Sequence, residues 1–287
     1  MGFEFHAPAT IDAAIALAQT HGAAARFIAG GTDLVIQIRR RRLAPQHLIS
    51  LSGLGLDTIT ETSAEHAIGA TVTHNDVVFH PAFQRELIAL TEASAVVGGR
   101  QVRNIATVGG NIVNASPAAD LVPVLLALDA EVDLVGTNGV RSLPLDRFLL
   151  DRGRTDRRDD EVLTRVRFAK PPAASASCFL KAGRRKAMEI SVICVAAHLT
   201  GKAGAGFAEA RIAVGAAASR TFRVPDAEAA VVARGEAAFA EAGRLAARAA
   251  SPIDDVRASA RYRRLLVTTL VERALRRCRD RLKQAGR

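Results

Sequence analysis

Two glycine pairs, each preceded by apolar residues, constrain this chain more than any other feature of its sequence. Glycine lacks a Cβ atom and tolerates positive φ, so successive backbone N–H groups in such a turn can converge on an anion. The predicted local order is strand, tight turn and helix. We therefore predict a diphosphate site built from two segments, which are Phe27, Ile28, Ala29, Gly30, Gly31, Thr32, Asp33, Leu34 and Ala106, Thr107, Val108, Gly109, Gly110, Asn111, Ile112.

Polar side chains flank both glycine pairs. Thr32, Thr107 and Asn111 would add hydroxyl and amide hydrogen bonds beside the backbone donors. A single Gly-Gly pair is typical of an ordinary tight turn, whereas two pairs with polar flanks favour a diphosphate site. Neither segment contains GxxxxGK[ST] or GxGxxG. A Walker NTPase and a Rossmann dinucleotide-binding protein therefore both lose support.

A further informative stretch runs from Asn114 to Pro123 and leads into the apolar residues Val124–Leu128. Ser116 and Pro117 predict the N-cap and the first residue of a helix, which would place Asp120 in its first turn. A carboxylate there would stabilise the helix dipole, or it would accept hydrogen bonds from ribose or ribityl hydroxyls. The spacing leaves both roles open.

Short elements of both kinds alternate in the first part of the chain. Residues 10–21 have the apolar spacing of a helix that Thr10 caps. A second helix follows the first glycine pair, with Thr32 or Asp33 as its cap. Asn138-Gly139 lies between two β-branched stretches and predicts a hairpin. This part of the chain is therefore expected to be mixed α and β.

The last third of the chain has a different pattern. Pro171-Pro172 marks a boundary, after which three strand-like blocks at 178–181, 190–199 and 210–214 precede two helices rich in alanine and arginine. A length of 287 residues suits about two domains. We therefore predict an α+β protein with domains at 1–172 and 173–287.

Most of the net charge lies near the C-terminus. The chain has 39 basic and 29 acidic residues, a formal charge of +10, and +9 of this comes from residues 257–287. Because apolar residues recur there at helical spacing, we predict an amphipathic helix whose outer face carries the arginines. The predicted apolar stripe is Val267, Leu270, Val271, Ala274, Leu275, Cys278 and Leu282. The basic face is interpreted as solvated surface, as a docking surface for an acidic partner or, with least support, as a nucleic-acid-binding surface.

Other features exclude other classes of protein. The apolar run Leu121–Leu128 is too short to span a bilayer, and the N-terminus lacks the positive start of a secretory signal. Three dispersed cysteines without CxxC spacing argue against a disulfide framework and an iron–sulfur cluster. His74 and His80 are expected in loops, and no histidine spacing indicates a metal site. We therefore predict a cytoplasmic protein without a metal of its own.

Three blocks of sequence resemble a known family. They are AGGTDL, VRNIATVGGNIVNASPAADLVPVLLAL and FLKAGRRKAMEISVICVAAHL, and they span roughly residues 27–199. In this order they resemble the FAD-binding medium subunits of molybdenum hydroxylases, the family of carbon monoxide dehydrogenase medium subunits and xanthine dehydrogenase FAD-binding subunits. The resemblance implies an N-terminal FAD-binding domain of the vanillyl-alcohol-oxidase (PCMH) type, with subdomains at about 1–55 and 56–172. It also implies a C-terminal domain with an antiparallel sheet and helices.

The resemblance also implies where FAD binds. In such proteins the two glycine segments hold the FAD diphosphate, which carries over to residues 27–34 and 107–111. Asp120 matches the family's acid after the second segment. Leu163 matches an apolar residue beside the flavin, with a core leucine as the alternative. Lys181 would stabilise a reduced anionic flavin or bind a phosphate, with a surface lysine as the alternative.

The same resemblance implies partners and an activity. The partners would be a small subunit with two [2Fe–2S] clusters and a large subunit with molybdopterin, assembled as a dimer of heterotrimers. Electrons would pass from the clusters through FAD to NAD⁺ or a quinone, making the chain a flavin-dependent oxidoreductase subunit. Because the flavin performs the redox chemistry, no catalytic side chain is predicted. The alternatives are a free-standing flavoprotein oxidoreductase and a basic nucleic-acid-binding protein.

Overall fold

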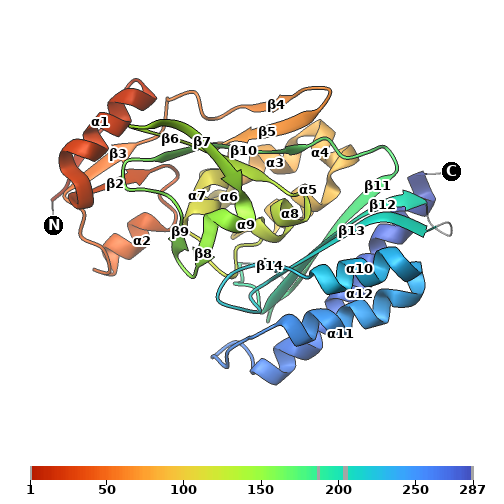
Figure 1. Ribbon diagram of the computed structural model, residues 1–287. Helices are drawn as coiled ribbons and strands as arrows, with labels where there is room; N and C mark the ends of the chain where they lie inside the picture. Colours follow the sequence, from red (N-terminus) through yellow and green to blue (C-terminus); the bar gives the residue numbers. More distant parts are fainter. Residues whose placement is uncertain (1, 186–187, 203–205, 286–287) are drawn as a thin grey trace.

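The computed structural model describes residues 2–185, 188–202 and 206–285, and three units follow one another along the chain (Figure 1). The first unit is a parallel three-stranded sheet in the order β1-β3-β2 with two helices. Its elements are β1 (Glu4–His6), α1 (Ile11–His21), the 3-10 turn η1 (Gly22–Ala24), β2 (Ala25–Ile28), α2 (Leu34–Arg39) and β3 (His47–Ser50). The predicted cap of α1 is confirmed, because the Thr10 hydroxyl accepts a hydrogen bond of 3.1 Å from the Ala13 N–H.

The second unit is a five-stranded antiparallel sheet in the order β4-β5-β10-β6-β7. Its strands are β4 (Ile59–Glu61), β5 (Glu65–Gly69), β6 (Glu131–Gly136), β7 (Gly139–Pro144) and β10 (Val162–Ala169). The predicted hairpin between β6 and β7 is confirmed, but its two-residue loop is Thr137-Asn138, because Gly136 pairs with Gly139, whose φ is 90°. A small hairpin pairs β8 (Leu149–Asp151) with β9 (Arg154–Thr155).

Short helices cover one side of this sheet. They are α3 (His74–Phe79), α4 (Pro81–Glu86), α5 (Ile88–Ala95), α6 (Arg100–Arg103), α7 (Val108–Val113), α8 (Val122–Ala127) and α9 (Leu145–Phe148). Buried residues of the sheet, such as Val132 and Val166, share one hydrophobic core with Ile112 of α7 and Leu125 of α8. The residues on either side of the glycines of the second segment, Val108 and Ile112, belong to this core.

The third unit is an antiparallel sheet in the order β11-β12-β13-β14, followed by helices. Its elements are β11 (Ser175–Ala182), β12 (Ile193–Lys202), β13 (Gly206–Gly215), β14 (Phe222–Arg223), α10 (Pro225–Arg234), the 3-10 turn η2 (Gly235–Ala238), α11 (Phe239–Ala249) and α12 (Ala260–Ala285). The expectation of two helices is wrong, because Gly235, with a φ of 60°, ends α10 and the chain turns through η2 into a separate α11.

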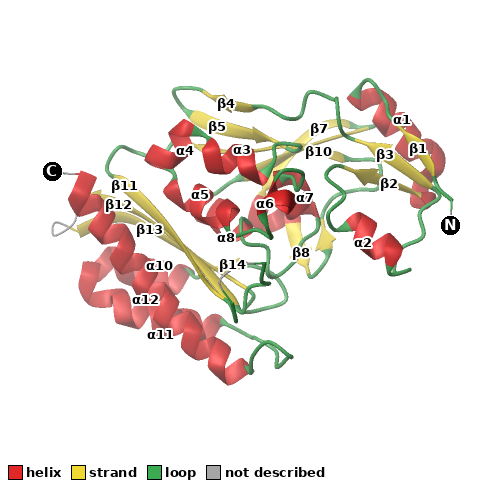
Figure 2. Cartoon of the chain, turned by 180° about the vertical axis from the view of Figure 1, so that it is seen from behind, coloured by secondary structure: helices red, strands yellow, loops and turns green. Residues whose placement is uncertain are grey.

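The molecule is layered, with the helices of the second unit lying between the two antiparallel sheets (Figure 2). Strand β12 shows why its sequence is almost continuously apolar. Cys194 and Ala196 point into the core shared with α8, whereas Val195 and Ala197 point into the core shared with α12. Because both faces of the sheet are covered, polar residues have no solvent-facing positions along the middle of this strand.

The prediction that a helix starts at Ser116 and Pro117 is wrong. Residues 116–121 form turns, in which the Ser116 hydroxyl accepts a hydrogen bond of 3.3 Å from the Ala118 N–H. The Pro117 carbonyl accepts a hydrogen bond of 2.6 Å from the Ala216 N–H, a tertiary contact that keeps the segment out of a helix. Helix α8 begins only at Val122, so Asp120 precedes the helix instead of occupying its first turn.

The amphipathic helix predicted near the C-terminus is confirmed as α12. All seven residues of the predicted apolar stripe are buried. Part of the positive charge is used within the chain, because Arg281 pairs with Glu92 and the buried Arg263 pairs with Asp255 at 2.6 Å. Basic side chains of α12 therefore help to hold this helix against the rest of the protein. No helix among the described residues is long and apolar enough to cross a bilayer.

Candidate functional site

The two glycine segments meet at one cavity of about 490 Å³. All residues from Phe27 to Leu34 line it, and the second segment contributes Ala106, Thr107, Gly110 and Asn111. The segments are in direct contact, since a Cβ atom on Gly30 would lie 1.7 Å from the carbonyl oxygen of Ile105. The structure thus brings together residues of the first and second units that are far apart in the sequence.

The first segment presents backbone donors to this cavity. It follows β2, and Gly31 reverses the chain with a φ of 67° before α2 begins at Leu34. None of the N–H groups of Ala29 to Leu34 donates a hydrogen bond to another described residue. The predicted Asp33 cap occupies the right position but makes no capping bond, because its carboxylate accepts a hydrogen bond from Gln37. These N–H groups are consequently available to an anion.

The second segment is built differently from the prediction. Gly109 and Gly110 lie inside helix α7, with negative φ, and not in a turn after a strand. The N–H groups from Val108 to Asn111 are all bonded within the protein, to the carbonyls of Val72, Ala70 and Thr107 and to the Thr107 hydroxyl. Gly109 is required because the backbone of Ala70 approaches to within 2.7 Å of where a Cβ atom would lie. Val108 and Gly109 are buried and do not line the cavity.

Side chains on this side of the cavity have unused hydrogen-bonding capacity. The Asn111 Oδ1 and the His74 Nε2 are buried and have no hydrogen-bond partner among the described residues. His74 was expected in a loop, but it is the first residue of α3 and is fully buried, with its Nδ1 3.4 Å from the Ser94 hydroxyl. Burial, helped by the charge of Arg103, lowers the pKa of His74 to about 4. The ring is therefore neutral and can donate from one nitrogen only.

Sequence reasoning missed His74 as a site residue. The Thr73-x-x-Asp76 pattern forms a capping box, with the Thr73 N–H 2.9 Å from the Asp76 carboxylate, and this signal could have placed the start of α3 at His74. Nothing local indicates that the ring lines a cavity. That position depends on the packing of α3 against α5.

Two further predicted residues, Asp120 and Lys181, are brought together. The Lys181 Nζ lies 2.7 Å from the Asp120 Oδ2, and the Ser191 hydroxyl donates to the other carboxylate oxygen. Burial raises the pKa of Asp120 although Lys181 and Ser191 act in the opposite direction. Lys181 is largely buried, so it is not a surface lysine. It lines a second cavity of about 420 Å³, which also includes Val96.

The two cavities are neighbours, and Leu163 belongs to neither. Val97 lines the cavity of the glycine segments, while the preceding Val96 lines that of Lys181. Lys181 also donates a hydrogen bond of 3.3 Å to the Val96 carbonyl, which ties β11 to this edge. Leu163 is buried in β10 within the main hydrophobic core. Its placement beside a flavin stays a prediction.

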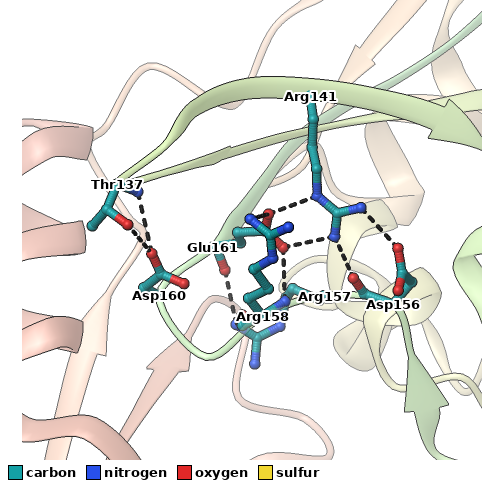
Figure 3. A network of polar contacts seen from close by, with 7 residues as sticks. All are labelled: Thr137, Arg141, Asp156, Arg157, Arg158, Asp160 and Glu161. Atoms are coloured by element: carbon teal, nitrogen blue, oxygen red, sulfur yellow. Dashed lines mark hydrogen bonds and ion pairs between the residues drawn. The ribbon is translucent and has the colours of Figure 1, made fainter.

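A charged network links β7 to the loop that precedes β10 (Figure 3). Arg141 of β7 donates a hydrogen bond of 2.6 Å to the buried Glu161. Burial alone would raise the pKa of Glu161, but the hydrogen bonds and charge around it, chiefly from Arg141, lower it overall. Arg157, in the same loop, donates to three backbone carbonyls, and its guanidinium carbon lies 5.8 Å from the centre of the Phe27 ring. The loop thereby supports the wall of the cavity.

Comparisons with known proteins agree with this architecture. Residues 1–171 match the model of the FAD-binding domain in molybdopterin dehydrogenases, and residues 178–278 match that of the C-terminal domain of the CO dehydrogenase flavoprotein. The chain is 31% identical to the carbon monoxide dehydrogenase medium chain of Hydrogenophaga pseudoflava, over 95% of this chain and 96% of that one. It is 33% identical to the xanthine dehydrogenase FAD-binding subunit of Escherichia coli O157:H7, over 78% of this chain and 77% of that one.

A solved structure of carbon monoxide dehydrogenase from Hydrogenophaga pseudoflava superposes with a TM-score of 0.93 at 31% identity, covering 97% of both chains. Fold and sequence together define a flavoprotein with an FAD-binding domain of the PCMH type. More specifically, the chain belongs to the family of FAD-binding subunits of molybdenum hydroxylases. It is an FAD-binding, flavin-dependent oxidoreductase subunit, and it acts together with other subunits.

Proposed function

We propose that the cavity between the two glycine segments holds the FAD diphosphate. The observation that carries this proposal is the row of unbonded N–H groups from Ala29 to Leu34, which line a cavity and precede a helix. On the other side, the Thr107 hydroxyl, the Asn111 side chain and the neutral His74 ring supply further hydrogen bonds. Gly110 lines the cavity, and a Cβ atom there would lie 2.8 Å from the Thr107 Oγ1.

The Asp120–Lys181 pair would act toward the flavin end of the same cofactor. Bound FAD supplies the redox chemistry, because its ring can take up and release electrons singly or as a hydride. The Lys181 side chain is largely buried beside the neighbouring cavity, and Asp120 and the Val96 carbonyl fix its position. A cation held there would favour negative charge on a reduced ring.

The electron path would begin and end outside this chain. Electrons would come from a small subunit with two [2Fe–2S] clusters, which are reduced by a large molybdopterin subunit, and would leave to NAD⁺ or a quinone. All three cysteines are buried, and no group of potential metal ligands among the described residues includes one of them. This supports clusters on a separate protein. We further propose a cytoplasmic dimer of heterotrimers.

Competition with adenine nucleotides tests the diphosphate site. Flavin-free protein is titrated with FAD, followed by flavin fluorescence, in the presence of ADP, AMP or adenosine. Because charge-assisted hydrogen bonds to a diphosphate are stronger than those to a neutral group, ADP should compete at least about 10-fold better than adenosine, with AMP between them. Equal competition by ADP and adenosine would contradict the proposal that this cavity holds the diphosphate. Copurification with cluster and molybdopterin subunits tests the assembly separately, and reduction of NAD⁺ or a quinone analogue by that complex identifies the acceptor.

A further inference from the structure

Three histidines from three different elements converge outside the cavity of the glycine segments. His6 ends β1, His21 ends α1 and His47 begins β3. One ring nitrogen of each lies within 4.8 Å of the others. His47 pairs in register with Ala25, the first residue of β2, and neither these two residues nor His6 and His21 line the cavity of the glycine segments. This histidine cluster is therefore separate from the site described above.

The distances suit ligands of a single ion. The His6 Nε2 and the His47 Nδ1 are 3.1 Å apart, close to the edge of about 3.3 Å in a tetrahedron with Zn–N bonds of about 2.05 Å. The Glu4 carboxylate lies beside them, with one oxygen 3.5 Å from the His47 Nδ1 and the other 3.9 Å from the His6 Nδ1. Glu4 is mostly exposed, so its carboxylate is free to move toward an ion.

The kind of ligand favours a transition-metal ion. The ring of His21 is stacked on that of His47, with centroids 3.6 Å apart. Neutral imidazole is the ligand that divalent zinc, nickel and copper prefer, whereas calcium and magnesium prefer oxygen. The His6 Nε2 and the His47 Nδ1 share a hydrogen bond, which an ion bound between them would replace.

We propose that His6, His21, His47 and Glu4 form a binding site for a divalent transition-metal ion, with zinc as its representative. The site takes its ligands from β1, α1 and β3, so an ion there would fasten the N-terminal strand to the rest of the first unit. Because the stacked rings of His21 and His47 cannot both contain the ion in their planes, His21 turns on binding. No sequence spacing reveals this site, since positions 6, 21 and 47 match no metal-binding motif.

Calorimetric titration of the full chain tests this site. The protein is treated with EDTA, dialysed and titrated with ZnCl₂ at neutral pH. We expect one tightly bound Zn²⁺ per chain, an affinity lowered at least about 100-fold in His47→Asn, and no change in His80→Asn, whose imidazole lies outside the cluster. A His6→Asn variant and circular dichroism spectra of all variants separate loss of ligands from loss of fold.

Thermal unfolding gives a second measurement. ZnCl₂ should raise the melting temperature of the wild type and of His80→Asn but not of folded His47→Asn or His6→Asn. If wild type and a folded His47→Asn bind Zn²⁺ equally, or if His80→Asn weakens binding as much as His47→Asn, the site is refuted. Neither result bears on FAD binding.

Discussion

The two glycine segments share a sequence pattern but contribute in different ways. In the first segment the N–H groups of Ala29 to Leu34 have no partner among the described residues and line the cavity. In the second, every N–H from Val108 to Asn111 is already bonded within the protein. The first segment thus offers backbone donors, whereas the second offers side chains carried on a helix. A Gly-Gly pair alone does not indicate which of these a segment provides.

The glycines themselves are needed for a reason common to both segments. A Cβ atom on Gly30 would meet the carbonyl of Ile105, and one on Gly109 would meet the backbone of Ala70. In each case another part of the protein backbone approaches closely, and only glycine leaves room for it. The difference lies in what happens to the neighbouring N–H groups. Carbonyls of residues 70, 72 and 107 and the Thr107 hydroxyl accept those of the second segment, whereas no described residue accepts those of the first.

The largest effect is expected from Gly30→Ala. A methyl group 1.7 Å from the Ile105 carbonyl oxygen cannot be accommodated, so the two segments must move apart. Because both then lose their common position around the diphosphate, FAD affinity should fall at least about 100-fold, measured by fluorescence titration. Gly2→Ala is the control, since no atom lies within 4 Å of its added methyl. Wild-type affinity in Gly30→Ala would contradict a joint site.

The contribution of side chains near the second glycine segment to FAD binding is tested by comparing His74→Gln with His198→Gln. Both rings are buried, and burial lowers the pKa of each to about 4 from an ordinary 6.5. Between these pH values the unfolded chain binds more protons than the folded one, so stability increases as pH rises from about 4 to 6.5. Each histidine accounts for up to roughly 3 kcal/mol of this increase. Either variant should flatten the dependence of unfolding free energy on pH, measured by denaturant titration.

The two variants should differ in FAD binding. Only His74 lines the cavity, so His74→Gln should weaken FAD about 10-fold, whereas His198→Gln should leave the affinity unchanged. Equal FAD affinities in the two variants would show that the His74 ring does not contact the cofactor. The backbone donors of the first segment would then bind FAD without a contribution from His74.

The smallest effects are expected from Gly109→Ala and Gly110→Ala, which distinguish the roles of the two glycines in the second segment. Gly109→Ala places a methyl group against the Ala70 backbone and should lower the stability of the flavin-free protein by about 2 kcal/mol. Gly110→Ala meets only the Thr107 hydroxyl, so stability should change by less than about 1 kcal/mol while FAD affinity falls. Chemical denaturation and FAD titration of both variants measure this. A reversal of the two effects would contradict the assignment of Gly109 to packing and Gly110 to the cavity.

Much of the fold could be predicted from the sequence because the relevant interactions are short-range. The Thr10 cap of α1 involves residues three apart, and the hairpin between β6 and β7 likewise joins Gly136 to Gly139. The apolar stripe of α12 follows from helical periodicity alone. The start of α8 could not be predicted, because the contact that keeps Pro117 out of a helix comes from Ala216, far along the chain.

For the site, residue type and local pattern in the sequence by itself determined the two glycine segments and Asp120 as candidates, and the family resemblance added Lys181. Only the tertiary structure decided that Lys181 pairs with Asp120, that His74 lines the cavity and that the second segment is a helix with bonded N–H groups. Each of these depends on groups from separate elements meeting in space. Hydrogen-bond partners and burial are properties of packing, and local sequence patterns do not encode which distant group arrives.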